Sequence, residues 1–134
     1  MKNKEIKNWR LMQHIDFKDR KEGFLKVYSN NTFLHELIKF KIFYKLKRLG
    51  FKMYSECRFS NNSGRADLVA IKEGKGWIIE VLNSEKEERY NEKLNKYPIE
   101  FEMVQVNCKD FKLEDFEIWI LYRTKNLLKI VRNL

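Results

Sequence analysis

The sequence predicts an α/β domain with a mixed central sheet flanked by helices. A long apolar helical segment is followed by three strand-like segments in succession, then by a polar helical segment and a further strand. A strand–helix–strand crossover places its two strands in parallel, whereas directly connected strands pair antiparallel. The length of 134 residues fits one domain, and a hydrophobic fraction of 43% is enough for a buried core.

The first of these segments, Asn31–Leu49, is expected to be a helix. Asn30 or Asn31 can cap it, and Gly50 ends it. Its apolar residues are spread over most of the helix circumference. The pattern therefore predicts a helix that is largely buried.

Four later segments have the composition of strands. Phe51–Ser60 alternates between apolar and polar residues, which predicts a half-exposed strand. Gly76–Asn83 is apolar on both faces and is expected at the centre of the sheet. Arg65–Lys72 lies between these two, and Ile99–Asn107 follows a polar helix predicted at Ser84–Tyr97.

The two ends of the chain are less regular. Residues 1–30 are expected to form an N-terminal arm, a dimer contact or an extra layer, and residues 31–134 to form a single domain. In the C-terminal part, the pattern predicts a strand at Glu117–Arg123 and a short helix at Asn126–Leu134.

The charge of the chain predicts a polyanionic partner. Lys and Arg number 28 against 19 Asp and Glu, which gives a net charge of +9. Nucleic acid is the first candidate and an anionic membrane surface the second; a lysine-rich surface that only aids solubility is the alternative. No zinc-finger, recognition-helix or aromatic–basic stacking pattern stands out. The residues expected to contact nucleic acid are Lys41, Lys45, Arg48, Arg65, Arg89 and Lys96.

Other features favour a cytoplasmic protein. No segment is long and apolar enough to span a bilayer, and the lysine-rich N-terminus is not expected to be a signal peptide. Cys57 and Cys108 lie far apart, without CxxC spacing or a neighbouring His cluster. They are expected to be buried free thiols rather than zinc ligands or a disulfide.

Two acids stand inside apolar strands and are the first candidates for chemistry. Asp67 lies in Arg65–Lys72 and Glu80 in Gly76–Asn83. Burying a carboxylate costs several kcal/mol unless a cation or hydrogen bonds compensate. Because a short turn joins these strands, the two carboxylates can converge and form a site for Mg²⁺ or Mn²⁺. A position at a sheet edge or a lysine partner is the alternative reading of either acid.

Glu36 is a third candidate, early in the predicted helix. Phe40 and Phe43 follow it at four and seven residues, so it stands on an apolar part of the helix. It could contribute to the metal site or to a water bound there. Alternatively, Lys39 or His35 could be its partner.

The order of these elements and acids resembles the PD-(D/E)XK nuclease superfamily, and is similar in particular to small archaeal Holliday-junction-resolvase-like nucleases. The resemblance extends over residues 31–107 and depends on Glu36, on Gly64–Ala70 around Asp67 and on Trp77–Leu82 around Glu80. It implies a restriction-endonuclease-like core, made of a helix, a three-stranded meander, a helix and a strand. Residues 31–134 would then be one nuclease-like domain.

The resemblance also implies an activity, namely metal-dependent hydrolysis of phosphodiesters in nucleic acid. DNA is the expected substrate, cut by an endonuclease that can be selective for structure. Asp67, Glu80 and the carbonyl of Val81 would hold Mg²⁺ or Mn²⁺, with Glu36 at a second metal or its water. A homodimer would cut two strands, because one site cuts one strand.

The sequence departs from this pattern at Leu82, where the superfamily has a lysine two residues after the glutamate. A lysine from the following helix can take over its role, and Lys86 and Lys93 are the candidates. Alternatively, the chain is a catalytically inactive nucleic-acid-binding or regulatory protein on the same fold. A third reading is a subunit whose fold serves assembly.

Overall fold

The computed structural model describes residues 3–82, 92 and 96–109. The predicted elements at 117–123 and 126–134 lie outside these residues, as does most of the polar helix predicted at 84–97. The described elements, in chain order, are α1 (Asn3–Met12), the short 3-10 helix η1 (Phe17–Asp19), α2 (Phe33–Arg48), β1 (Lys52–Arg58), β2 (Arg65–Lys72), β3 (Lys75–Leu82) and β4 (Phe101–Asn107).

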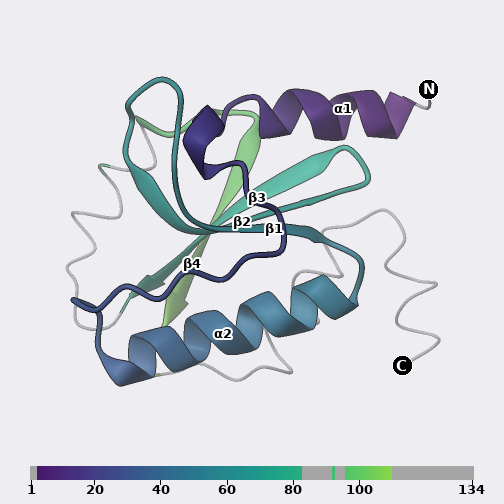
Figure 1. The fold of residues 1–134 in the computed structure, drawn as a ribbon. Helices are drawn as coiled ribbons and strands as arrows, with labels where there is room; N and C mark the ends of the chain where they lie inside the picture. Colours follow the sequence, from purple (N-terminus) through teal and green to yellow (C-terminus); the bar gives the residue numbers. More distant parts are fainter. Residues whose placement is uncertain (1–2, 83–91, 93–95, 110–134) are drawn as a thin grey trace.

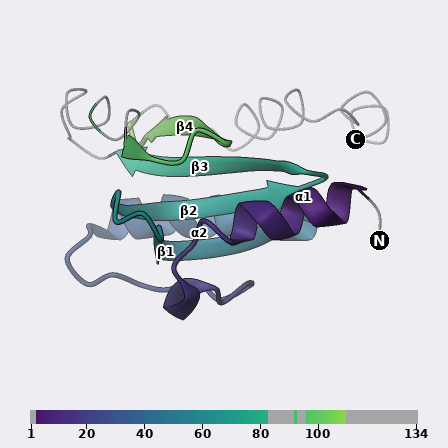
Figure 2. The same ribbon diagram turned by 90° about the horizontal axis from the view of Figure 1, so that it is seen from above.

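The four strands form one mixed sheet in the order β1-β2-β3-β4, as Figure 2 shows. β1 and β2 pair antiparallel, β2 and β3 pair antiparallel, and β3 and β4 pair parallel. The expected α/β class and mixed sheet are therefore confirmed. β3 has a neighbour on each side and is buried from Gly76 to Leu82, in keeping with its apolar sequence.

Helices cover both faces of this sheet (Figure 1). The α2-side core joins Ile42 and Leu46 to strand residues such as Trp77. The α1-side core joins Leu11 to strand residues such as Ile78. Residues 3–12 thus form a layer of the domain, on the side of the sheet opposite α2.

The prediction of a half-exposed first strand is wrong. β1 is buried at every position from Met53 to Cys57. One reason is that α1 lies on the face that the sequence pattern assigned to solvent. The other is Glu56, whose positive φ of 46° interrupts the alternation, so that Tyr54 and Cys57 pack in the same core.

The prediction of a largely buried first helix is also wrong. α2 begins after Thr32, whose side chain accepts the backbone N–H of His35, rather than after Asn30 or Asn31. Only one side of the helix packs on the sheet. Phe33, Phe40 and Tyr44 are 81%, 48% and 51% exposed on its outer side.

The segment between α1 and α2 covers the outer edge of β1. An Asp19 carboxylate oxygen accepts the backbone N–H of Arg58 at 2.9 Å. Further along, Glu22 accepts the N–H of Met53 at 3.2 Å, and Gly23 donates to the carbonyl of Met53 at 2.8 Å. These bonds satisfy backbone groups that an edge strand would otherwise offer to another chain.

Two further expectations can be compared with the described residues. Neither helix in this part of the chain has the length and apolar character that crossing a membrane requires. Cys57 and Cys108 are free and buried, as predicted. Burial raises the pKa of the Cys57 thiol far above its ordinary value, so it stays protonated and packs as an apolar side chain.

Candidate functional site

Asp67 stands at a break in the strand pairing. It is the one residue of β2 without a register partner on either neighbouring strand. The side chains around it also change face, because Ala66 packs in the α1-side core and Leu68 in the α2-side core. At this break Asp67 Oδ2 accepts the backbone N–H of Val81 at 2.8 Å. The carboxylate therefore takes the place of a backbone partner between β2 and β3.

Glu80 lies beside Asp67 on the neighbouring strand. The β2–β3 register ends at Leu68 and Ile79, one residue before this pair, and an interaction with Glu80 is among the causes that lower the pKa of Asp67. Glu80 is only 1% exposed, and the hydroxyl of Tyr97 donates to its Oε1 atom at 2.9 Å. Burial and the neighbouring Glu80 raise the pKa of Tyr97, so the hydroxyl remains a hydrogen-bond donor. The predicted convergence of the two strand acids is present.

His35 of α2 links this pair to the third candidate acid. Its Nε2 atom lies 3.4 Å from Asp67 Oδ2, and its Nδ1 atom lies 3.4 Å from Glu36 Oε1. Burial lowers the pKa of His35, but the two carboxylates outweigh burial and raise it. Burial likewise opposes ionisation of Asp67, yet the hydrogen bonds from His35 and Val81 hold its pKa below the ordinary value. The contact thus favours the charged form of both groups.

Lys39 lies one turn further along α2 and is completely buried. Its Nζ atom donates to Glu36 Oε1 at 3.0 Å, to Glu56 Oε1 at 3.0 Å and to the carbonyl of Lys26 at 2.8 Å. All three N–H donors of the ammonium group therefore have protein acceptors. Burial opposes ionisation of Glu36, but the bonds from Lys39 and Asn31 lower its pKa. Glu36 is held as a carboxylate.

Glu56 extends the network to the outside of the domain. Its Oε2 atom lies 3.2 Å from Arg65 Nε, and its side chain is 6% exposed. The Arg65 guanidinium in turn lies 4.1 Å from the ring centroid of Tyr28. Arg65 is thereby fixed at the rim of the site, between an aromatic ring and a buried carboxylate.

We call this group the acid cluster, and it has four carboxylates: Glu36, Glu56, Asp67 and Glu80. Two side chains of fixed positive charge, Lys39 and Arg65, contact it. His35 adds a positive charge only when it is protonated. When all four carboxylates are ionised, the cluster keeps a net negative charge, and such a charge attracts a cation.

The donor set suits a hard divalent cation. Among the described residues, no group of three or more His, Cys, Asp or Glu side chains is arranged to hold a metal ion. Mg²⁺, however, is commonly bound through one or two carboxylates, with waters and substrate phosphates completing its shell. Asp67 and Glu80 provide two adjacent carboxylates, and the backbone N–H of Val81 donates to the first of them. The residues present therefore fit such an ion.

The other predicted residues are distributed more widely. Lys86, Arg89 and Lys93 lie outside the described residues, so the proposed replacement for the missing lysine does too. Leu82 is buried, which agrees with its apolar character. Lys41 and Arg48 are exposed on the outer side of α2, Lys45 is half-buried, and Lys96 is exposed near Tyr97 in the chain. Arg65 is joined directly to the acid cluster through Glu56.

Several members of the cluster were missed as site residues by reasoning from sequence. His35 and Lys39 appeared there only as alternative partners of Glu36, and in the structure both contact it. Glu56 looked like a solvent-facing strand residue, because its left-handed backbone leaves no signal in the alternation of the strand. Tyr97 is far from Glu80 in sequence, and only the crossover brings the two together.

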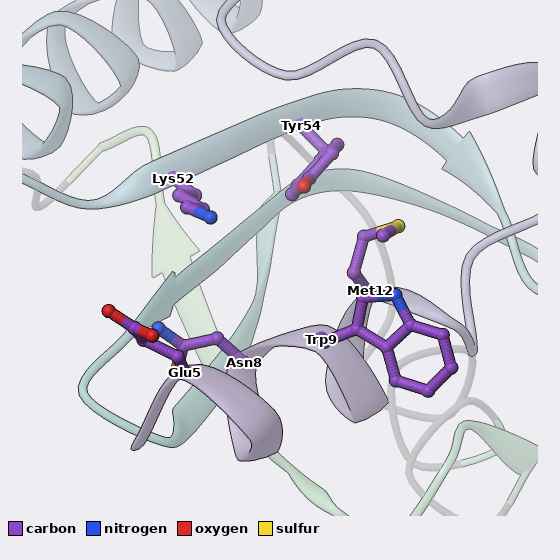
Figure 3. Close-up of a pocket in the computed structure, with 6 residues that line it drawn as sticks. All are labelled: Glu5, Asn8, Trp9, Met12, Lys52 and Tyr54. Carbon is purple, nitrogen blue, oxygen red and sulfur yellow. The ribbon is translucent and has the colours of Figure 1, made fainter. Parts of the chain in front are cut away.

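A pocket of about 340 Å³ lies elsewhere, between α1 and the start of β1 (Figure 3). Trp9 and Met12 of α1 and Tyr54 of β1 line it, and the side chain of Met12 extends toward Tyr54. Glu5 and Lys52 lie at its margin, one acid and one base, so the lining has no charge preference. The pocket is lined by fewer ionisable side chains than the acid cluster contains.

Comparison of the chain with protein families, with curated proteins and with solved structures finds no match.

Proposed function

We propose that this protein is a Mg²⁺- or Mn²⁺-dependent nuclease of the PD-(D/E)XK type, acting on DNA. The observation that carries the proposal is the adjacent pair Asp67 and Glu80 at the break in the pairing of β2. The helix–meander–strand order around this pair, with β4 parallel to β3, supports a restriction-endonuclease-like core. The net charge of +9 suits a polyanionic substrate.

The strand acids and the backbone beside them would hold the metal ion. Asp67, Glu80 and the carbonyl of Val81 are its proposed ligands, all of them oxygen donors. When bound, the metal would supply an activated water and neutralise charge on the phosphate. The backbone N–H of Val81 donates to the Asp67 carboxylate at the break in the sheet. This hydrogen bond fixes the direction of the carboxylate before an ion binds.

The helix residues of the cluster have a positioning role in this proposal. His35 lies against Asp67 from the α2 side, and Glu36 Oε1 lies 3.4 Å from its other ring nitrogen, Nδ1, without a hydrogen bond between them. Lys39 fixes Glu36 and Glu56. Because its three donors already have acceptors, Lys39 is not the group that would orient the attacking water. That role remains assigned to Lys86 or Lys93.

A second candidate function is nucleic-acid binding without cleavage. The observation that favours it is Leu82, which is buried and apolar where the superfamily has its lysine. In this reading, the acid cluster is a structural network or a metal site without turnover. The two functions share a partner and differ in chemistry, so a cleavage assay separates them.

The test is cleavage of labelled single-stranded, duplex and four-way-junction DNA in Mg²⁺, in Mn²⁺ and in EDTA. The variants Asp67→Asn and Glu80→Gln keep the shape of each side chain and remove its charge. We expect cleavage that requires metal and that falls by two orders of magnitude or more, roughly, in both variants. Glu5→Gln on α1 removes an exposed acid far from the cluster and should cleave like the parent protein.

Metal binding gives a second readout that does not depend on turnover. A ligand at about 100 times its Kd stabilises the native state by about 2.7 kcal/mol, so Mn²⁺ should raise the melting temperature of the parent protein and of Glu5→Gln. The shift should be lost in Asp67→Asn. A Mn²⁺-dependent shift without cleavage would support the second function, and the absence of both would overturn the metal site.

A further inference from the structure

The outer side of α2 exposes a row of aromatic rings. Phe33, Phe40 and Tyr44 follow one another at seven and four residues, which places them on one side of the helix. They are 81%, 48% and 51% exposed. The opposite side carries buried residues, among them Ile42 and Leu46, so the aromatic row points away from the sheet. Large apolar side chains exposed together mark a contact surface.

The rings in this row are ordered against one another. The centroids of Phe40 and Tyr44 lie 5.9 Å apart with an interplanar angle of 30°, a stacked arrangement. The Arg48 guanidinium lies 5.6 Å from the ring centroid of Tyr44 and also donates to its hydroxyl at 3.2 Å. Contacts of this kind restrict the side chains before a partner binds, which reduces the entropy lost on binding.

Positive charge accompanies the rings. No acidic residue occurs from Leu37 to Ser55. Lys41 and Arg48 are exposed, and by helical spacing they flank the aromatic row on one side. We refer to the five residues as the aromatic–basic face: Phe33, Phe40, Lys41, Tyr44 and Arg48.

We infer that the aromatic–basic face binds single-stranded nucleic acid. Bases stack on Phe40 and Tyr44, while Lys41 and Arg48 contact the phosphates. A duplex cannot use the face in this way, because its bases already stack on one another and present only their edges. The inference deepens the proposed function by naming the form of nucleic acid, and it can be tested without metal or cleavage.

A second copy of the chain is the competing occupant. In a symmetric dimer the same face meets itself, so Lys41 and Arg48 of each copy would approach the same residues of the other. Because no acidic residue occurs from Leu37 to the end of α2, a symmetric dimer through this face would bring positive charges of the two copies together, which is unfavourable. Charge complementarity therefore favours a polyanion.

The test is fluorescence anisotropy with a labelled oligothymidine and with a duplex of equal length, both in EDTA. The parent protein should bind the single strand more tightly. Phe40→Ala and Tyr44→Ala should each raise the Kd for the single strand about tenfold, the scale of one lost stacking contact. Phe40→Leu retains apolar area without a π-face and should be weakened similarly. Lys41→Ala should remove about one phosphate contact, so the slope of log Kd against log salt concentration should fall by about 1.

The matched control is Trp9→Ala. Trp9 is 58% exposed on α1, on the opposite side of the sheet, and its removal should leave the Kd unchanged. Equal affinity for single strand and duplex, or a Kd unaffected by Phe40→Ala and Tyr44→Ala, would overturn the inference. So would a concentration-dependent dimer in sedimentation velocity that dissociates in these variants, because the face would then belong to a second copy. Loss of cleavage with retained binding would affect only the proposed nuclease chemistry.

Discussion

Each of the two sides of α2 has residues that depart from the usual distribution of apolar and charged side chains. On the inner side, Lys39 is completely buried among carboxylates. On the outer side, Phe40 and Tyr44 are about half exposed, at 48% and 51%. A helix selected for stability alone would bury aromatic rings and expose lysine. Both departures cost stability, so each is a candidate for function, the inner side for chemistry and the outer side for binding.

The two sides of α2 should also differ in how well they tolerate substitutions. The inner groups depend on each other, because removing one leaves its partners buried and charged. The outer groups face solvent, and their loss leaves no unpaired group in the interior. Substitutions on the inner side should therefore change stability, and those on the outer side should change binding.

The largest effect is expected from Lys39→Met. The substitution keeps the volume of the side chain but removes the cation between Glu36 and Glu56. Breaking a buried ion pair costs about 3–5 kcal/mol, so the free energy of unfolding in urea should fall by that amount. Lys41→Met, on the outer side, should change it by less than about 0.5 kcal/mol. A small effect of Lys39→Met would mean that the buried ion pairs are not mutually dependent.

An intermediate effect on the free energy of unfolding is expected at Asp19, a partly buried acid that accepts hydrogen bonds from Lys26 and from the backbone of Arg58. Burial opposes its ionisation, but the N–H of Arg58 and the ammonium of Lys26 hold its pKa below the ordinary value of 3.8. A lowered folded-state pKa contributes stability above pH 3.8, and that stability is lost as the pH falls through the folded value. Asp19→Asn should therefore cost about 1 kcal/mol near neutral pH.

The sign of this effect is checked by following unfolding against pH. The difference between the parent protein and Asp19→Asn should be constant above about pH 5 and should shrink as the pH falls below 3.8. A difference that grows on acidification would contradict the assignment. Added Mn²⁺ should leave the difference unchanged, in contrast to its proposed effect at Asp67.

The smallest effect on stability is expected from Phe40→Ala. The side chain is 48% exposed, so its removal should change the free energy of unfolding by about 0.5 kcal/mol or less. Phe43 is the matched comparison three residues away, since it is 8% exposed in the α2-side core. Phe43→Ala should cost about 3–5 kcal/mol. Similar losses of unfolding free energy for the two variants, measured by thermal or urea unfolding, would show that Phe40 is buried against another surface in solution.

The sequence by itself determined the order and type of the described core elements and the neighbourhood of Asp67 and Glu80. Hydrophobic periodicity and turn residues are local signals, and a short hairpin brings its two strands together whatever packs around them. The single apolar run around Glu80 also sufficed to place β3 inside the sheet, because both of its faces needed cover.

Only the tertiary structure decided which groups surround these acids and which side of α2 is free. His35 and Lys39 reach the acid cluster from α2 and Tyr97 from the residues before β4, and their distances depend on how these parts of the chain pack on the sheet. The exposure of Phe40 could not be predicted from the sequence either. An apolar residue shows that burial would be favourable, but it does not show whether a partner surface exists. Burial is a property of two surfaces, and the sequence of one helix describes only one of them.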